Sequence, residues 1–357
     1  MKYFRFDSLL LAILLMLITI GLIVSYSASG GDMAVVKGQL IRVGIGLFIM
    51  LAIAQVPSYF FYRLAPALFL FGLALLLAVE LAGDVGKGAQ RWLDLGVMRF
   101  QPSELSKLIV PLMVARYLSE RAHPLPWRYI AGALLLIVLP VALILGQPDL
   151  GTALMVTASG LAVIFFAGIS WRLMVGGAAL GLALVPVAWH FMHDYQRRRV
   201  LTLLDPSSDP LGAGYHIIQS MIAIGSGGVW GKGWMNGTQA HLKFLPESST
   251  DFIFAVFAEE FGLVGCGVLL TLYLALLLRG LQISATAGDS FGRLMAGAIV
   301  AIFFFYVVVN IGMVAGVLPV VGVPLPLISY GGSSLVTLLL GFGVLMAVRN
   351  DRKMWTK

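Results

Sequence analysis

The stretch His193-Asp194-Tyr195-Gln196-Arg197-Arg198-Arg199 opens the only long hydrophilic part of this sequence, residues 192–250. That part closes at Phe244-Leu245-Pro246-Glu247-Ser248-Ser249-Thr250-Asp251, where an apolar run resumes. On both sides the chain is a succession of apolar segments close to the roughly 20 residues that a helix needs to cross a bilayer. The sequence therefore predicts a membrane protein whose polar chemistry is concentrated in one loop.

The composition supports this class. Hydrophobic residues make up 59% of the chain and charged residues 11%, whereas soluble domains carry roughly 25% charged residues. The mean hydropathy is +0.94. We predict ten membrane spans, near residues 8–26, 40–57, 63–83, 104–119, 129–146, 150–169, 173–191, 251–278, 293–315 and 332–348.

These spans are expected to be helices, because every backbone group in the hydrocarbon layer needs a partner within the protein. No segment shows the alternation of a membrane β-strand. The first span is too long for a signal peptide and is interpreted as an uncleaved anchor. The predicted fold is an all-α polytopic membrane protein, with residues 1–357 forming a single integral membrane domain.

The basic residues that flank short loops predict the orientation. If the N-terminus is cytoplasmic, the short outer loops hold only Lys37, Arg42, Lys87, Arg91 and Arg99. The cytoplasmic ends hold many more, namely Lys2, Arg5, Arg63, Arg116, Arg121, Arg128, Arg172, Arg279, Arg293, Arg349, Arg352, Lys353 and Lys357. Both termini are therefore predicted inside, and the loop 192–250, between the seventh and eighth spans, outside. The net charge of +7 reflects this topology, and a nucleic-acid partner is not expected.

Several kinds of site are disfavoured by the sequence. Cys266 is the only cysteine, which excludes an intrachain disulfide. The histidines lack metal-ligand spacing, so no protein metal site is predicted. The run Gly225-Ser226-Gly227-Gly228-Val229-Trp230-Gly231-Lys232-Gly233 has a lysine among glycines but not the spacing of a phosphate-binding P-loop.

Two groups of ionisable residues interrupt or border the spans. Glu104 and Lys107 are three residues apart, hence on one helix face. They could form an ion pair within the helix, or Lys107 could present its charge to an anionic ligand while Glu104 orients it. Asp149, in Gln147-Pro148-Asp149-Leu150-Gly151-Thr152, is placed to cap the sixth span.

A third group lies where the hydrophilic loop ends. The Ser-Ser-Thr-Asp run before an apolar helix is a capping pattern, so Thr250 or Asp251 could simply cap that helix. Asp251 is also four residues from Glu247, at the predicted membrane boundary. Burial at such a boundary raises the pKa of a carboxylate, which would suit a general base.

Basic residues near this loop indicate an anionic partner. Arginine side chains match the geometry of phosphate, so a phosphate-bearing lipid in the outer leaflet is one interpretation, and a solvated basic rim is the other. The residues concerned are Arg91, Arg99, Arg197, Arg198, Arg199, Lys232 and Lys243.

Several motifs resemble the SEDS family (shape, elongation, division and sporulation). Asn310 is followed by Gly316, Pro319 and Gly322, and then by Leu327-Ile328-Ser329-Tyr330-Gly331-Gly332-Ser333-Ser334. The other matching stretches are Arg91-Trp92-Leu93-Asp94-Leu95-Gly96, Phe100-Gln101-Pro102-Ser103-Glu104, Pro148-Asp149-Leu150-Gly151-Thr152 and Leu245-Pro246-Glu247 to Thr250-Asp251-Phe252. The glycine-rich segment 316–334 is expected to be irregular backbone sheltered by protein.

The resemblance implies a peptidoglycan glycosyltransferase that polymerises lipid II at the outer face of the bacterial cytoplasmic membrane. It puts the catalytic aspartate at Asp251, as the base that deprotonates the acceptor sugar for an attack with inversion. Candidate substrate-binding residues are Glu104, Lys107, Arg91, Arg99, Arg197, Arg198, Lys232, Lys243, Glu247 and Ser329. A divalent cation, Mg²⁺ or Mn²⁺, could stabilise the departing pyrophosphate, but no ligand set in the sequence demands one.

The expected partners are lipid II, the growing glycan strand, membrane lipids and a class B penicillin-binding transpeptidase. The motif around Arg91 and the short N-terminus before residue 8 favour the elongation branch of the family, RodA, over the division branch, FtsW. The alternative activity is a lipid II flippase. A transporter would spread polar groups across the membrane, often over inverted repeats. Here they cluster toward the outer side, and no repeat is visible.

Overall fold

The computed structural model describes residues 6–86, 89–94, 99–121, 125–192, 194–209, 212–241 and 247–355. Each predicted span coincides with a helix. These helices are α1 (Ser8–Ala28), α2 (Met33–Ile53), α3 (Ser58–Ala82), α4 (Pro102–Ser119), α5 (Trp127–Gly146), α6 (Leu150–Phe166), α7 (Trp171–Phe191), α11 (Ile253–Ala285), α12 (Ser290–Val314) and α13 (Ser333–Trp355). The start predicted for the second span was wrong. Because α2 begins at Met33, Lys37 and Arg42 lie within a helix and not in an outer loop.

The helices make a multi-pass membrane protein. In the described residues, α1, α2, α3, α5, α11, α12 and α13 contain stretches long and apolar enough to cross a bilayer, while α6 and α7 have shorter apolar stretches. α4 carries buried charged side chains in the interior of the bundle. The number of ten spans, the orientation and the side on which the large loop lies stay predictions.

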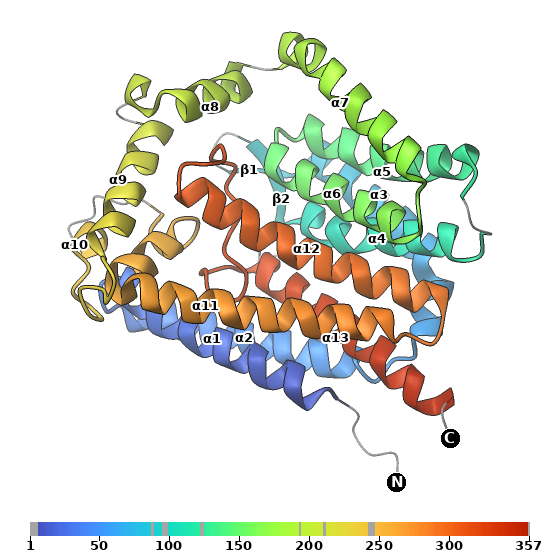
Figure 1. Cartoon of the computed structure of the whole chain (residues 1–357), viewed down its shortest axis with the longest axis horizontal. Coiled ribbons are helices and arrows are strands. Elements are labelled where there is room, and N and C mark those ends of the chain that lie inside the picture. Colours follow the sequence, from blue (N-terminus) through green and yellow to red (C-terminus); the bar gives the residue numbers. More distant parts are fainter. Residues whose placement is uncertain are drawn as a thin grey trace.

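Helices distant in sequence pack side by side. Figure 1 shows α1, α2, α11, α12 and α13 running alongside one another, with α1 beginning and α13 ending at the same end of the molecule. α7 lies at the outer edge, and none of its described side chains is buried. Such an apolar, exposed helix is suited to lipid.

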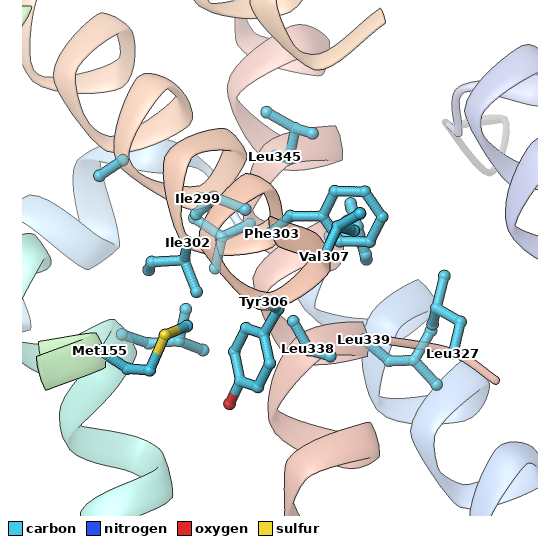
Figure 2. Close-up of a cluster of buried hydrophobic side chains, with 14 of the residues drawn as sticks. Met155, Ile299, Ile302, Phe303, Tyr306, Val307, Leu327, Leu338, Leu339 and Leu345 are labelled. Carbon is cyan, nitrogen blue, oxygen red and sulfur yellow. The ribbon is translucent and has the colours of Figure 1, made fainter. Parts of the chain in front are cut away.

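The interior of the bundle centres on α12. Phe303 and Tyr306 are 1% exposed and pack against leucines of α13, with Met155 of α6 on the other side (Figure 2). Phe303 also contacts the rings of Tyr273 and Phe342 edge-on. This packing fixes α12 as the central element.

Local sequence sets most helix ends. Asp149 accepts a hydrogen bond from the Thr152 amide and caps α6, as predicted. Asp7 and Asp32 cap α1 and α2 in the same way. Pro102 occupies the first turn of α4, where its missing N–H costs nothing.

The hydrophilic part also contains regular structure. It includes α8 (Asp194–Leu204), the short 3₁₀ helix η1 (Pro206–Ser208), α9 (Ala213–Ser226) and α10 (Thr238–His241). A small antiparallel sheet, which the sequence analysis did not anticipate, precedes α4. Its order is β1 (Asp84–Gly86), β2 (Ala89–Asp94), β3 (Arg99–Phe100).

The glycine-rich run 225–233 packs against an interruption in α11. Gly262 has φ 64° and ψ −163°, so the helix is interrupted there. The amides of Lys232 and Gly233 donate to the carbonyls of Glu259 and Glu260, at 3.0 Å each. The amides of Leu263 and Val264 donate in turn to the carbonyls of Gly228 and Val229.

Only glycine fits this contact. A Cβ on Gly231 would lie 2.1 Å from the Glu260 carbonyl oxygen. The run therefore replaces the hydrogen bonds that the broken helix has lost, which backbone in a membrane requires.

The segment between α12 and α13 is irregular, as predicted. Four different helices hydrogen-bond its carbonyls. Asn310 donates to Val323, Tyr273 to Pro326, Ser25 to Ile328, and Gln39 to Ser329. The surrounding helices thus provide the shelter that non-helical backbone needs within the bundle.

Candidate active site

Asp251 lies in a turn immediately before α11. The turn begins at Glu247, which has a positive φ of 54°, and its carbonyl accepts hydrogen bonds from the amides of Thr250 and Phe252. The N-cap of α11 is Phe252, and no side chain caps the helix. The interpretation of Thr250 or Asp251 as an ordinary cap was therefore wrong, because both residues lie in the turn before the N-cap position.

Three successive backbone carbonyls of this turn accept hydrogen bonds from α12 and from the segment between α12 and α13. The Tyr330 amide donates to the Ser249 oxygen at 2.8 Å, and the Ser329 hydroxyl donates to the Thr250 oxygen at 2.6 Å. The Asn310 side-chain amide donates to the Asp251 oxygen at 2.9 Å. We call Asn310, Ser329 and Tyr330 the carbonyl clamp. It fixes the backbone from which the Asp251 carboxylate projects.

The clamp is itself braced. Asn310 is fully buried, and its amide also donates to the Val323 oxygen at 2.7 Å. The Ser329 hydroxyl accepts from the Leu325 amide at 2.8 Å. Gly322, with φ 72°, lies beside Asp251, and a Cβ there would come within 3.4 Å of the carboxylate oxygen Oδ2. These contacts hold the turn in place, and Asp251 itself is half-buried.

Glu104 and Lys107 form the predicted ion pair in the interior. Lys107 Nζ lies 2.6 Å from Glu104 Oε1 and 2.5 Å from the Tyr306 hydroxyl. The Tyr306 hydroxyl in turn donates to Glu104 Oε2 at 3.2 Å. All three residues are buried. The group links α4 to α12 through Tyr306, which lies four residues before Asn310 on α12. A role of Glu104 and Lys107 toward substrate stays a prediction.

Lys232 is paired within the protein. Its Nζ lies 2.7 Å from Oε1 of Glu259, whose side chain is fully buried. Glu259 also accepts hydrogen bonds from the amides of Thr238 and Gln239. The main partner of Lys232 is thus a buried carboxylate that ties the loop after α9 to α11.

Three of the family-like motifs meet at the start of α6. Arg91 donates to the carbonyl oxygens of Gln147 and Pro148. The Gln101 amide donates to Asp149 Oδ2 at 3.0 Å. The structure therefore gives Arg91 a bracing role between β2 and the turn after α5.

The other predicted basic residues are dispersed. Arg197 donates to the last carbonyls of α7, those of Trp189 and His190, and Arg198 is exposed on α8. Lys243 and the side chain of Arg99 lie outside the described residues. The expected convergence of these cations on one point is not seen in the described part of the chain.

Two predicted polar residues lie at the Asp251 turn itself. Glu247 is exposed, and its carboxylate accepts a hydrogen bond from the Thr250 hydroxyl at 2.9 Å. Ser329 is buried, and its hydroxyl is occupied by the two hydrogen bonds of the clamp. Ser329 therefore supports the turn, because its donor is used within the protein.

Sequence reasoning did not assign a site role to Asn310, Tyr306 or Arg42. A signal existed for each, since a polar side chain within an apolar helix usually faces a partner or a functional site. Among the residues that the structure describes, no cluster of three or more His, Cys, Asp or Glu side chains could hold a metal ion.

The chain matches known proteins along nearly its whole length. Residues 7–354 match the family model FTSW_RODA_SPOVE, described as cell cycle protein. The peptidoglycan glycosyltransferase MrdB of Escherichia coli is 54% identical over 98% of this chain and 95% of its own. The peptidoglycan glycosyltransferase RodA of Treponema pallidum is 33% identical over 96% of this chain and 97% of its own.

Solved structures agree with this assignment. A chain of a peptidoglycan synthase complex that coordinates polymerization and crosslinking superposes with a TM-score of 0.85 at 35% identity, over 97% of this chain and 98% of its own. The rod shape determining protein RodA of Thermus thermophilus gives a TM-score of 0.74 at 32% identity, over 99% of both chains. The protein therefore belongs to the FTSW_RODA_SPOVE family of cell cycle proteins, as its SEDS-like motifs indicated.

Proposed function

We propose that this protein is a peptidoglycan glycosyltransferase that polymerises lipid II at the outer face of the bacterial cytoplasmic membrane, during cell elongation. Two relatives with high coverage of the chain carry that enzyme name. The observation that carries the proposal is the clamped turn, which holds Asp251 on backbone anchored at three successive carbonyls.

The proposed reaction is a glycosyl transfer with inversion. The Asp251 carboxylate takes the proton from the 4-hydroxyl of the acceptor's N-acetylglucosamine. That oxygen forms a bond to the anomeric carbon of the donor's N-acetylmuramic acid from one face. The bond from this carbon to the diphosphate oxygen breaks on the other face, and undecaprenyl diphosphate leaves with the electron pair.

The clamp serves this step through positioning. A general base must hold its oxygen within hydrogen-bond reach of the hydroxyl proton, and misplacement by about 1 Å can cost on the order of a hundredfold in rate. The hydrogen bonds to the carbonyls of Ser249, Thr250 and Asp251 fix the backbone from which the carboxylate reaches the acceptor hydroxyl.

The leaving diphosphate needs positive charge nearby. Lys107 and Arg91 are already hydrogen-bonded within the protein, so Arg99, Arg198 and Lys243 remain the candidates among those that the sequence suggested. A divalent ion, Mg²⁺ or Mn²⁺, would take its ligands largely from the diphosphate. Polymerisation with and without a chelator tests that contribution.

The proposed partner is a class B penicillin-binding transpeptidase that crosslinks the strands made here. Support comes from the likeness to a chain of a synthase complex described by both polymerization and crosslinking.

The decisive experiment is polymerisation of labelled lipid II by the purified protein, alone and with this partner. Asp251→Asn should give no glycan ladder while remaining folded in detergent. Asp32→Asn, at an exposed aspartate that caps α2, is the matched control and should retain activity. Ladders from Asp251→Asn would refute the base assignment. Movement of labelled lipid II across liposome membranes, without ladders from the wild type, would assign the flippase activity instead.

A further inference from the structure

Arg42 is a cation whose surroundings the proposed reaction does not explain. It lies in α2, nine residues after the helix begins, about 14 Å along the axis at 1.5 Å per residue. Its guanidinium carbon is 4.5 Å from the centre of the Tyr330 ring. Its Nη1 atom is buried and has no hydrogen-bond partner in the part of the chain that the structure describes.

Four other cations have carboxylate partners. Lys107 pairs with Glu104, and Lys232 with Glu259. Arg279 and Arg349 both pair with the buried Asp7. Within the described residues Arg42 has only the face of an aromatic ring. A charged group in a spanning helix is costly unless an anion or water compensates it, so its place requires a compensating group.

The surroundings keep the guanidinium in place. Gly38, one turn earlier on α2, makes room for both side chains, because a Cβ there would lie 3.4 Å from the Tyr330 hydroxyl and 3.9 Å from Arg42 Nη1. Stacking on an aromatic face orients a planar guanidinium and leaves its edge donors available. Arg42 is half-buried, so the group is held without being enclosed.

Hydrogen bonds connect the Arg42–Tyr330 pair to the Asp251 turn. Tyr330, which stacks on Arg42, is the residue whose amide holds the Ser249 carbonyl. Gln39, on the same helix, donates to the Ser329 carbonyl at 3.1 Å and accepts from the Gly331 amide at 3.4 Å. Arg42 therefore belongs to the structural unit that positions the proposed base.

We propose that Arg42 binds the diphosphate group of a polyprenyl-linked substrate. The guanidinium fork matches phosphate oxygens, and the anion would compensate the charge that the described residues leave without a carboxylate. The proposal rests on the proposed function, since it identifies the ligand group that enters beside Asp251. It adds a residue of α2 to the cations that the sequence analysis suggested for the diphosphate.

The test is direct binding of labelled undecaprenyl diphosphate to the full-length protein in nanodiscs, with uncharged undecaprenol as the reference lipid. Arg42→Gln should weaken undecaprenyl diphosphate binding by about tenfold or more, as expected for a lost hydrogen bond to a charged group, and leave undecaprenol binding unchanged. Arg42→Lys should fall between this variant and the wild type. Lys37→Gln removes an exposed cation from the same helix and should bind as the wild type does.

Three outcomes would overturn the proposal. The first is unchanged binding of undecaprenyl diphosphate by Arg42→Gln. The second is an equal loss of undecaprenol binding, which would indicate a damaged fold. The third is displacement of undecaprenyl diphosphate by phosphatidylglycerol at equal concentration, which would indicate a general anionic-lipid contact. Because binding is measured without polymerisation, the binding comparison could still be interpreted if the glycosyltransferase assignment failed.

Discussion

Replacing Asn310 by leucine tests the carbonyl clamp most directly. The substitution keeps a similar volume in a fully buried position but removes the two hydrogen bonds to Asp251 O, at 2.9 Å, and Val323 O, at 2.7 Å. Leaving a buried carbonyl without its partner costs about 1–2 kcal/mol, so the two losses together amount to about 2–4 kcal/mol. If this whole free energy were added to the activation free energy, the rate would fall roughly 30-fold to 1,000-fold.

Part of that cost will be relieved when the turn relaxes, so we expect kcat of lipid II polymerisation to fall at least tenfold. KM should change little, because Asn310 is buried and has no access to substrate. The assay measures kcat and KM together with the melting temperature of the purified variant. Asn310→Gln, which retains the amide one methylene further out, should recover part of the loss.

Ser220→Ala is the matched control. Its hydroxyl is equally buried and donates to Val314 O at 2.8 Å, at the end of the same helix α12 but outside the clamp. It should lower stability slightly and leave kcat within about twofold. The reasoning is refuted if Asn310→Leu keeps wild-type kcat, or if Ser220→Ala loses as much activity as Asn310→Leu does.

Two further predictions concern stability. Gly231→Ala should reduce the melting temperature and folded yield strongly, because its Cβ would meet the Glu260 carbonyl at 2.1 Å. Gly267→Ala, in open space on α11, should be neutral or stabilising, and equal melting temperatures for the two would contradict the packing argument. Burial lowers the pKa of His216 on α9 below its ordinary 6.5, although the negative charges of Glu247 and Asp209 act to raise it. The folded protein then binds this proton less readily than the unfolded chain, so stability should fall as the pH drops below about 6.5. His216→Gln should show a smaller fall in melting temperature between pH 7.5 and 5.5, and an identical fall would exclude His216 as its source.

The membrane class and the helices could be predicted from the sequence because their causes are local. An apolar run of sufficient length must form a helix in lipid, and this placed α1, α3, α5 and α12 within a few residues of their ends. Single residues such as Asp149 and Pro102 mark helix starts through their own backbone chemistry. The start of α2 was missed because Lys37 and Arg42 interrupt its hydropathy, although a helix continues through them.

The candidate site could be predicted only in part. The position of Asp251, at the end of the hydrophilic stretch and within a family-like motif, was visible in the sequence. The small sheet before α4 was not, because its strands are too short to show a period. Whether a basic residue is available to a ligand was also hidden, since Lys232 is paired with Glu259, which is 27 positions away.

The sequence by itself determined that this chain is a membrane-embedded helical protein with one polar loop closing at Asp251, because hydropathy and capping act over neighbouring residues. Only the tertiary structure decided which groups hold that aspartate. The donors to Ser249, Thr250 and Asp251 come from residues 59 or more positions further along the chain. The cation that stacks beside them, Arg42, comes from the second helix. Hydrogen bonds between such distant residues depend on how the helices pack, and no local pattern in the chain specifies that packing.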